Sequence, residues 1–530
     1  MIFHSPHPDI DIPDGPYDAL ILAQAAARGD RAAFVDGATG RVLSFAQVAD
    51  GVQRVAAALA QRGFGRGDVL AVVLPNLPEY ALVFHGVLRA GGVVTTANPL
   101  YTAHELAHQF GLTRACFVVT VPSCVDKVRA AAQGTAVREV FVVGEAAGAT
   151  PFDELLRDAG PPPEVRIDPA RDLAVLPFSS GTSGPPKAVM LTHRNLVAIT
   201  RQVEGAGLSS FDESARALAV LPFFHIYGMV ALMSFPLYRG ACCVTLPRFE
   251  LEHFLQVAQD QRATHLYLVP PIVLALAKHP SVDRYDLSSV RRINSGAAPL
   301  DAGVQRAVAE RLRTGVSQGY GMTETSLAIS ITADGELQPR EGASGRLLPN
   351  MQARIVDPAS GALLGPGQDG EIVVRGPNVM QGYLDDSAAT AGCLDAEGWL
   401  RTGDIGHIDA EGYVYVVDRV KELIKYKGMQ VAPSELEGVL LAHPAVADAA
   451  VIPSPDEEAG EIPKAFVVLK GEAATDPAAL MAWVAQRVAP HKRIRLVEIV
   501  PQIPKSPSGK ILRRLLVDQE RARVQAQPRT

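Results

Sequence analysis

Four segments of the chain contain residue types that could bind and activate a phosphorylated compound. The first, SSGTSGPPK at 179–187, follows the apolar run LAVLPF at 173–178. Its glycines and hydroxyl side chains allow backbone N–H groups and hydroxyls to close around phosphate oxygens, and Lys187 adds a mobile positive charge. The segment lacks the G-K-[ST] ending of a Walker A loop. Taken alone, it is equally typical of a flexible surface loop.

The second segment, QGYGMTE at 318–324, combines a group that can stack on a base with oxygen ligands. The glycines around Tyr320 permit close backbone approach, so its flat ring could lie against a nucleotide base. Thr323 could hydrogen-bond a phosphate, and Glu324 is a suitable ligand for Mg²⁺. Considered alone, the segment could also be a glycine-rich turn with an unrelated carboxylate.

Two further segments each contribute one charged group. In GWLRTGD at 398–404, the carboxylate of Asp404 could accept hydrogen bonds from both hydroxyls of a ribose, or it could cap a turn. In PKSPSGK at 504–510, Lys510 follows a glycine hinge and precedes a basic helix predicted at 511–516. Most lysines in such a place are only solvated, so neither segment decides the chemistry by itself.

The elements that must position these segments alternate between β-branched runs and helical patterns. An apolar stripe at helical spacing, Val48 to Leu59, follows the capping pair Ser44 and Gln47. Buried strands are predicted at 69–74, 116–121, 140–144 and 173–178. This alternation predicts an α/β fold with mostly parallel sheets flanked by helices.

The sequence pattern changes near residue 418, where the predicted strand YVYVVD is followed by the basic segment RVKELIKYKG. Beyond it, Ser434 and Glu437 match a capping box behind Pro433 and predict a helix in a small α+β tail. A basic segment between two apolar regions is typical of a domain joint. We therefore predict a large, multi-subdomain N-terminal domain at 1–418 and a small, mobile C-terminal domain at 419–530, with a hinge near 418–421.

The composition is that of a soluble globular protein with more than one domain: 530 residues, 48% hydrophobic and 20% charged. The net charge of -7 argues against a general nucleic-acid-binding protein. The N-terminal residues do not match a signal peptide, and no 18-residue apolar stretch is free of charge or proline. The five cysteines are odd in number and lack C-x-x-C spacing, which argues against a disulfide framework and favours a cytoplasmic protein.

In this order and at these separations, the four segments resemble those of the acyl-adenylate-forming superfamily, which joins acyl-CoA synthetases, peptide-synthetase adenylation domains and beetle luciferases. Other matching segments are NPLYT at 98–102, LPFFHIYG at 221–228, SGAAPL at 295–300, GEIVVRG at 370–376 and VDRVKELIKYKGMQVAPSELE at 417–437. The resemblance runs over nearly the whole chain and is strongest to the 4-coumarate–CoA ligase branch. It implies an AMP-binding domain followed by a mobile domain, and the use of ATP, Mg²⁺ and coenzyme A.

The resemblance also assigns roles to residues at matching positions. The ATP phosphates would be held by Ser179, Ser180, Gly181, Thr182, Ser183, Gly184 and Lys187. The adenine site would comprise Gly296, Ala297, Ala298, Pro299, Gln318, Gly319 and Tyr320, and the ribose would meet Asp404 and Arg419. Thr323 and Glu324 would serve the α-phosphate and Mg²⁺. Lys421 and Lys425 would approach the nucleotide or serve the hinge, and Gln430 and the catalytic Lys510 would meet the adenylate from the small domain. Coenzyme A would pass Arg248, Lys427 and Gly428.

The implied reaction is ATP-dependent ligation of a carboxylic acid to coenzyme A, with an aryl or arylacrylic acid such as 4-coumarate as the expected acid. The acyl group would lie against His225, Tyr227, Met229, Ala231, Ala297 and Gly321, and His225 would also take part in catalysis. Tyr227 and Met229 could equally be plain core residues. No nucleic acid, membrane span or obligate protein partner is expected.

Four alternatives stay open at this point. The acid could be a medium- or long-chain fatty acid. The chain could be a stand-alone acyl-AMP ligase that loads a carrier protein. A luciferase-like oxidation and a non-catalytic nucleotide sensor are the remaining possibilities, although a sensor would need no adenylation lysine.

Overall fold

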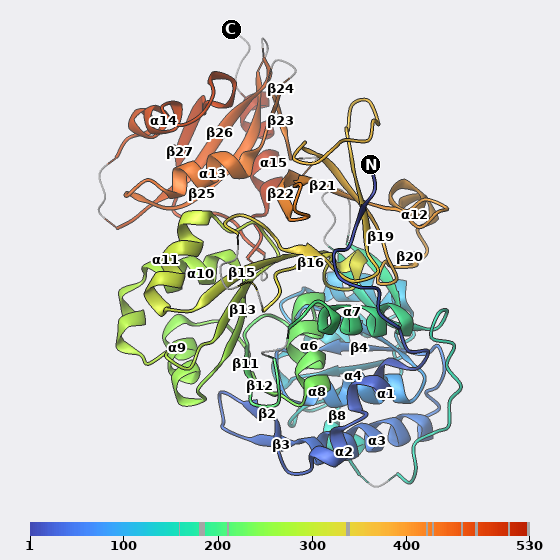
Figure 1. The fold of residues 1–530 in the computed structure, drawn as a ribbon. Coiled ribbons are helices and arrows are strands. Elements are labelled where there is room, and N and C mark those ends of the chain that lie inside the picture. Colours follow the sequence, from blue (N-terminus) through green and yellow to red (C-terminus); the bar gives the residue numbers. More distant parts are fainter. Residues whose placement is uncertain are drawn as a thin grey trace.

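The computed structural model shows a larger N-terminal body with a smaller C-terminal body seated on it (Figure 1). The structure describes residues 1–530 apart from 158, 180–185, 209–210, 335, 337–339, 420–421, 427–428, 457–458, 472–474, 507–508 and 527–530. No helix among the described residues is long and apolar enough to cross a membrane.

The first sheet of the large body is mostly parallel and contains the predicted strands. Its strands in spatial order are β20 (Gly382–Tyr383), β10 (Lys187–Thr192), β9 (Leu173–Ser179), β5 (Val93–Thr96), β4 (Val69–Val73), β6 (Phe117–Thr120), β7 (Glu139–Val142) and β8 (Thr150–Pro151). Pairing is parallel from β9 to β8 and antiparallel at β9–β10 and β10–β20. The four predicted strands are thus confirmed within one or two residues at their ends.

The second sheet, also parallel at its centre, carries two of the predicted segments, 295–300 after β14 and 318–324 at β15. Its strands in order are β17 (Arg346–Leu347), β16 (Ser330–Ile331), β15 (Gly315–Tyr320), β14 (Arg292–Ser295), β13 (His265–Leu268), β11 (Arg216–Ala219), β12 (Cys242–Thr245), β2 (Ala32–Asp36) and β3 (Val42–Ser44). Pairing is parallel from β15 to β2. The segments that begin with Gly296 and Gly321 therefore leave the sheet at the same edge, next to each other.

A third sheet is wholly antiparallel, which the alternation of strands and helices did not predict. Its strands in order are β1 (Phe3–His4), β18 (Gln352–Val356), β19 (Gly370–Arg375), β21 (Leu400–Ile408) and β22 (Val414–Arg419). β18 is followed directly by β19, and β21 directly by β22, whereas β20 and α12 lie between β19 and β21 in the chain; β1 is added from the N-terminus. The fold class is still α/β with mostly parallel sheets.

The predicted helix behind Ser44 is confirmed as α3 (Phe45–Gln61), including its capping box: Ser44 Oγ accepts from Gln47 N at 3.2 Å, and Gln47 Oε1 accepts from Ser44 N at 2.8 Å. The other helices of the large body are α1 (Tyr17–Leu22), α2 (Ala25–Arg28), α4 (Glu79–Arg89), α5 (Ala103–Thr113), α6 (Val125–Ala132), α7 (His193–Gly205), α8 (Phe235–Arg239), α9 (Leu251–Asp260), α10 (Pro270–Lys278), α11 (Ala302–Leu312) and α12 (Ser387–Cys393), together with a π-helical segment at Tyr227–Ser234. The largest apolar cluster joins most of these helices to the sheets, and a second cluster lies between α5, α6 and the first sheet.

The C-terminal body is a small α+β unit with its own core, as predicted. Its strands in order are β24 (Met429–Val431), β23 (Ile424–Tyr426), β26 (Gly460–Leu469) and β25 (Val446–Asp456), with β27 (Leu496–Ile499) parallel to β26. Its helices are α13 (Pro433–Leu441), α14 (Pro477–Ala485) and α15 (Arg513–Ala526). The domain boundary at 418 and the hinge stay predictions, and Val420 and Lys421 lie outside the described residues.

Two details of this tail differ from the sequence-based expectation. The helix behind Pro433 forms, but the capping box is wrong because Ala432 is the N-cap and Ser434 instead donates to the carbonyl of Val417. Glu437 accepts from Val451 N at 2.7 Å. The basic helix begins at Arg513 rather than residue 511, because Ile511 pairs with Lys505 in an isolated β-bridge.

Candidate active site

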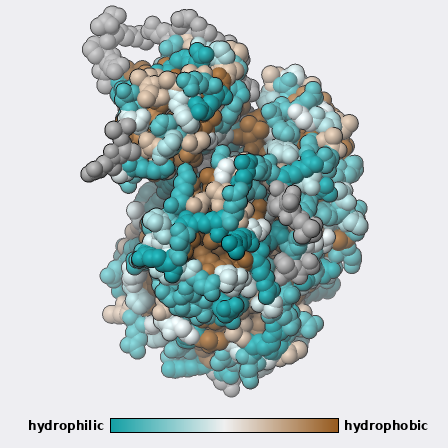
Figure 2. All heavy atoms as spheres, turned by 60° about the vertical axis from the view of Figure 1, so that its left-hand side comes forward, coloured by the Kyte–Doolittle hydropathy of each residue, from teal (hydrophilic) through white to brown (hydrophobic). Residues whose placement is uncertain are grey.

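A cavity of about 920 Å³ lies where the two bodies meet, and residues from both contribute to its wall. In the space-filling view a groove runs between the smaller and the larger body, with apolar residues visible along it (Figure 2). The wall includes the ends of β9, β14 and β15, the π-helical segment, and the loop that holds Lys510. The four predicted segments therefore converge on one space, although residues 180–185 of the first lie outside the described residues.

Lys510 reaches the cavity from a tight loop of the small domain. Its carbonyl accepts from Ser506 N at 2.8 Å, and its own N–H donates to Ser506 Oγ at 3.1 Å. Gly509 has a φ of +78°, which glycine adopts without strain, and an added Cβ would lie 3.3 Å from Pro271. Burial lowers the pKa of Lys510, and Arg419 lowers it further. This lysine thus presents a partly buried amine to the cavity.

Glu324 and Lys187 are linked through one tyrosine. Glu324 is buried just after β15, and the hydroxyl of Tyr383 donates to its Oε1 at 2.9 Å. The ammonium of Lys187 lies 5.0 Å from the centre of the Tyr383 ring and 3.8 Å from Asp386 Oδ2. Tyr383 therefore contacts both the predicted phosphate lysine and the predicted metal ligand. Thr323, also buried, lines the cavity beside Glu324.

Asp404 and Arg419 are cross-strand neighbours on β21 and β22. Arg419 Nε lies 3.1 Å from Asp404 Oδ1, and the hydroxyl of Tyr320 donates to Asp404 Oδ2 at 2.8 Å. Burial raises the pKa of Asp404, whereas Arg419 and Tyr320 act in the opposite direction. The antiparallel sheet thus brings the expected ribose pair next to the expected adenine tyrosine.

The predicted acyl wall is largely assembled around His225 and Tyr227. Burial, with a smaller effect of Lys510, lowers the pKa of His225 to about 3, so its ring is neutral near pH 7. Its Nδ1 accepts from Tyr227 N at 3.3 Å, which leaves the proton of the neutral ring on Nε2. A Cβ on Gly296 would lie 2.8 Å from the Tyr227 ring, so only glycine leaves room for that ring. Ala231, Ala297 and Gly321 also line the cavity.

Several predicted residues lie elsewhere. Met229 belongs to the apolar core, because the π-helical segment turns Val230 and Ala231 toward the cavity instead. Gln318 points behind the site, where its amide donates to Gln305 Oε1 at 3.1 Å and its carbonyl oxygen accepts from Leu300 N at 2.9 Å. Arg248 and Lys425 are exposed, and their side chains do not line this cavity.

Of the remaining predicted site residues, only some line the cavity. Ser179, Gly296, Gly319 and Arg419 line the cavity, whereas Ala298 and Pro299 are not among its lining residues. Ser180, Gly181, Thr182, Ser183, Gly184, Lys421, Lys427 and Gly428 lie outside the described residues, and only the backbone of Gln430 is described, on β24.

The sequence reasoning missed four residues that the fold brings to the cavity: Tyr267, Arg292, Tyr383 and Asp386, the last through its ion pair with Lys187. The run GYLDD at 382–386 offered a signal, because a tyrosine and carboxylates follow glycine there as in the other segments. Tyr267 and Arg292 lie within short strands and have no motif that distinguishes them from core residues.

Comparison with known proteins agrees with this geometry. The model of the AMP-binding enzyme family matches residues 21–384, and that of the AMP-binding enzyme C-terminal domain matches residues 435–510. The chain is 43% identical to 4-coumarate–CoA ligase 5 of Oryza sativa subsp. japonica, over 97% of this chain and 96% of that protein. It is 40% identical to the probable 4-coumarate–CoA ligase 1 of Dictyostelium discoideum, over 97% of each chain.

Solved structures give the same result. A structure of an anthranilate CoA ligase in complex with anthranoyl-AMP superposes with a TM-score of 0.89 at 25% identity, covering 97% of this chain and 99% of that one. ATP-bound MatB from Rhodopseudomonas palustris has a TM-score of 0.85 at 30% identity, covering 95% and 99%. The resemblance stated from the motifs is confirmed, and the chain belongs to the AMP-binding enzyme family of adenylate-forming ligases.

Proposed function

We propose that this protein is an ATP-dependent acid–CoA ligase that acts on an aryl or arylacrylic acid such as 4-coumarate. It joins the acid to AMP with release of pyrophosphate, and then transfers the acyl group to coenzyme A with release of AMP. The observation that carries this proposal is the single cavity shared by Lys187, Glu324, Arg419 and Lys510, with an apolar wall beside them. The full-length similarity to 4-coumarate–CoA ligases supports the same reaction.

In the first half-reaction a carboxylate oxygen attacks the α-phosphorus of ATP, and the bond from that phosphorus to the pyrophosphate oxygen breaks. A carboxylate is a weak nucleophile, so the protein's task is to orient the two anions and to offset their charge. Lys510 meets the carboxylate and the α-phosphate, and Lys187 meets the departing pyrophosphate. Neutral His225 can donate a hydrogen bond from Nε2 to the carboxylate without adding charge.

The side chains at the site also fit a Mg²⁺ ion that is bound mainly by the phosphates of the nucleotide. The described residues contain no group of three or more His, Cys, Asp or Glu side chains that could hold a metal by themselves. Mg²⁺ commonly uses one or two protein carboxylates and completes its shell with phosphate oxygens and water. Glu324 is such a carboxylate, held by Tyr383. When bound, the ion would supply charge neutralisation at the phosphates.

The second half-reaction needs a path by which the pantetheine thiol reaches the acyl-adenylate. Lys510 occupies the space at the acyl-adenylate that this thiol would need. A rotation of the small domain about the predicted hinge would remove Lys510 and present another face of that domain. Coenzyme A is then expected to pass Arg248, Lys427 and Gly428. Arg248 is exposed and pairs only weakly, at 3.5 Å, with the exposed Glu250, so its guanidinium is available to a phosphate.

The experiment that tests the reaction is ATP–pyrophosphate exchange, followed by AMP release, with and without coenzyme A. Exchange that depends on the acid, and thioester formation that depends on coenzyme A, are the expected results. Exchange without thioester would point to a carrier-protein ligase, and nucleotide binding without exchange would point to a sensor. A panel of hydroxycinnamates, benzoates, octanoate and palmitate tests the acid, and a preference of about tenfold for a fatty acid would overturn that part.

A further inference from the structure

Three neighbouring strands present polar side chains along one wall of the cavity. Arg292 and Asn294 alternate with the buried Ile293 on β14, so both side chains face the same side of the sheet. Tyr267 on β13 is the parallel partner of Asn294, and it lies on that side too, since all three line the cavity. Arg292 precedes Gly296 by four residues, or about 13 Å along an extended strand. It therefore lies at the end of the acyl wall distant from the adenylate.

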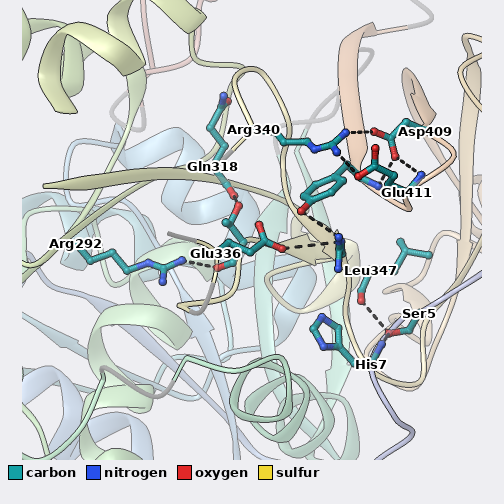
Figure 3. Close-up of polar contacts among 12 residues, drawn as sticks. Ser5, His7, Arg292, Gln318, Glu336, Arg340, Leu347, Asp409 and Glu411 are labelled. Carbon is teal, nitrogen blue, oxygen red and sulfur yellow. Dashed lines mark hydrogen bonds and ion pairs between the residues drawn. The ribbon is translucent and has the colours of Figure 1, made fainter. Parts of the chain in front are cut away.

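Arg292 is held rigidly at this distant end. Its guanidinium forms an ion pair with Asp334 and donates to the carbonyl of Thr332 and, at 3.3 Å, to Ser317 Oγ. Only 12% of its side chain is exposed. Figure 3 shows Arg292 extending toward Glu336, with the ion pair of Arg340 and Asp409, at 3.1 Å, farther from Arg292. The ion pair with Asp334 thus fixes the guanidinium of Arg292 in the cavity wall.

The groups on this wall offer donors rather than acceptors to a ligand. A guanidinium has five N–H groups, and three acceptors occupy that of Arg292 among the described residues. Asn294 Oδ1 already accepts from the hydroxyl of Tyr227 at 3.0 Å. The hydroxyl of Tyr267 makes no hydrogen bond with the described residues. Its ring stands edge-on to that of Tyr227, 6.4 Å between centres.

We propose that Tyr267 and Arg292 determine the specificity of the acyl site by selecting acids that carry a hydrogen-bond acceptor oxygen at the end opposite the carboxylate. This inference rests on the proposed function and makes its acid class more specific. A phenol or aryl ether oxygen fits the donors described above. A second carboxylate fits less well, because Asp334 already balances the charge of Arg292.

The same wall disfavours acids that end in an apolar tail. An alkyl chain that reached Arg292 would remove water from a guanidinium and a phenol hydroxyl without giving either a partner, and unpartnered buried polar groups are costly. Sites built around such groups discriminate strongly against analogues that lack the matching atom. The acyl site is therefore matched to acids with a polar distal end rather than to fatty acids.

The test compares two acids of nearly the same shape, 4-methoxycinnamate and 4-ethylcinnamate, which differ by an oxygen in place of a methylene. The corresponding benzoates extend the comparison to shorter acids. For the wild-type enzyme we expect kcat/KM for the methoxy acid to exceed that for the ethyl acid by about tenfold in at least one pair, the effect of one hydrogen bond. Ratios near one in both pairs, or better turnover of octanoate than of any aryl acid, would overturn the inference.

Variants assign the effect to the two residues. Tyr267→Phe removes one hydroxyl, and the double variant Arg292→Met with Asp334→Asn removes the guanidinium without leaving an unpaired carboxylate. Each should bring the methoxy-to-ethyl ratio close to one while turnover of the ethyl acid persists. Tyr285→Phe, which changes a tyrosine outside the cavity, should keep the wild-type ratio. Unchanged ratios in both test variants would refute the assignment. Absence of acid-dependent AMP formation with every acid would instead contradict the proposed function.

Discussion

The large and the small domain support their parts of the active site in different ways. Thr323 and Glu324 lie just after β15, a strand of the sheet that packs into the largest apolar cluster of the large body. Lys510 lies in the loop between β27 and α15. The apolar clusters of the small domain consist, among the described residues, only of residues after 423. Thr323 and Glu324 thus belong to the packing of the large domain. Lys510 belongs to the small domain, which has its own apolar core.

This difference indicates which contacts can change without unfolding the protein. The lysine loop meets the large domain through the cavity and a few neighbours, such as Gly509 beside Pro271. Arg513 at the start of α15 pairs with Glu422 and Glu437, both in the C-terminal part of the chain. The predicted rotation of the small domain would therefore leave its own packing and the packing around Thr323 and Glu324 intact.

The largest expected effect is on the lysine that comes from the small domain. Lys510→Ala should reduce ATP–pyrophosphate exchange several hundredfold, because losing a preorganised group that stabilises transition-state charge costs about 3–4 kcal/mol. Thioester formation from a supplied acyl-adenylate should be largely retained. Lys505→Ala, in the same loop but paired with Asp448 at 2.6 Å, is the matched control and should lose much less. Equal loss in both half-reactions would contradict the role of Lys510.

The separate packing of the small domain can be tested at its buried ion pair. Lys464 is 2.6 Å from Glu520, and both side chains are almost fully buried. Lys464→Met should lower the free energy of unfolding of this domain by about 3 kcal/mol, since a buried charge loses its partner. Trp483 reports on this domain and Trp399 on the large one, so single-tryptophan variants follow each in denaturant. If both transitions shift together, the two cores are not independent.

Low pH should weaken the same interactions between Lys464 and Glu520. Burial alone would raise the pKa of Glu520, but hydrogen bonds from Arg523, Lys464 and Ser454 lower it to about 2 from an ordinary 4.5. A carboxyl with a depressed pKa stabilises the fold above its unfolded pKa, and that stabilisation is lost as the pH falls from about 4.5 to about 2. Fluorescence of Trp483 should therefore report unfolding in this window, and Glu520→Gln should flatten the dependence.

A change at the predicted joint should affect the opposite half-reaction. Lys421→Pro fixes φ near −65° and restricts the residue before it, so rotation of the small domain would be hindered. We expect thioester formation to fall by about tenfold or more while pyrophosphate exchange survives. Lys421→Ala removes the charge without fixing φ, so a loss of thioester formation that appears only in the proline variant assigns the effect to the backbone. Wild-type rates in the proline variant would place the hinge elsewhere.

The smallest expected effect concerns a residue of the large domain. Tyr383→Phe keeps the ring beside Lys187 but removes the hydroxyl that donates to Glu324. A hydrogen bond to a charged group contributes about 1.5 kcal/mol, so exchange should fall roughly tenfold at most, with a raised Mg²⁺ requirement. Transfer from a supplied acyl-adenylate should not change. A similar loss in transfer would mean that Tyr383 supports the whole domain rather than the phosphate site.

Sequence patterns predicted the local features well because those depend on neighbouring residues. The capping box of Ser44 and Gln47 was confirmed, since both partners lie within one turn. The same pattern was wrong at Ser434 and Glu437, where Pro433 at the first helical position and the carbonyl of Val417 offered other contacts. A local rule therefore holds until a distant segment competes for its polar groups.

The sequence by itself determined the α/β class and the family, because these follow from periodicity and from motif order. Only the tertiary structure decided which side chains share a cavity. Tyr383 reaches Glu324 across 59 residues, and Arg292 meets Asp334 across 42. Such contacts depend on sheet order and on loops that return over the sheet, and no spacing along the chain encodes them.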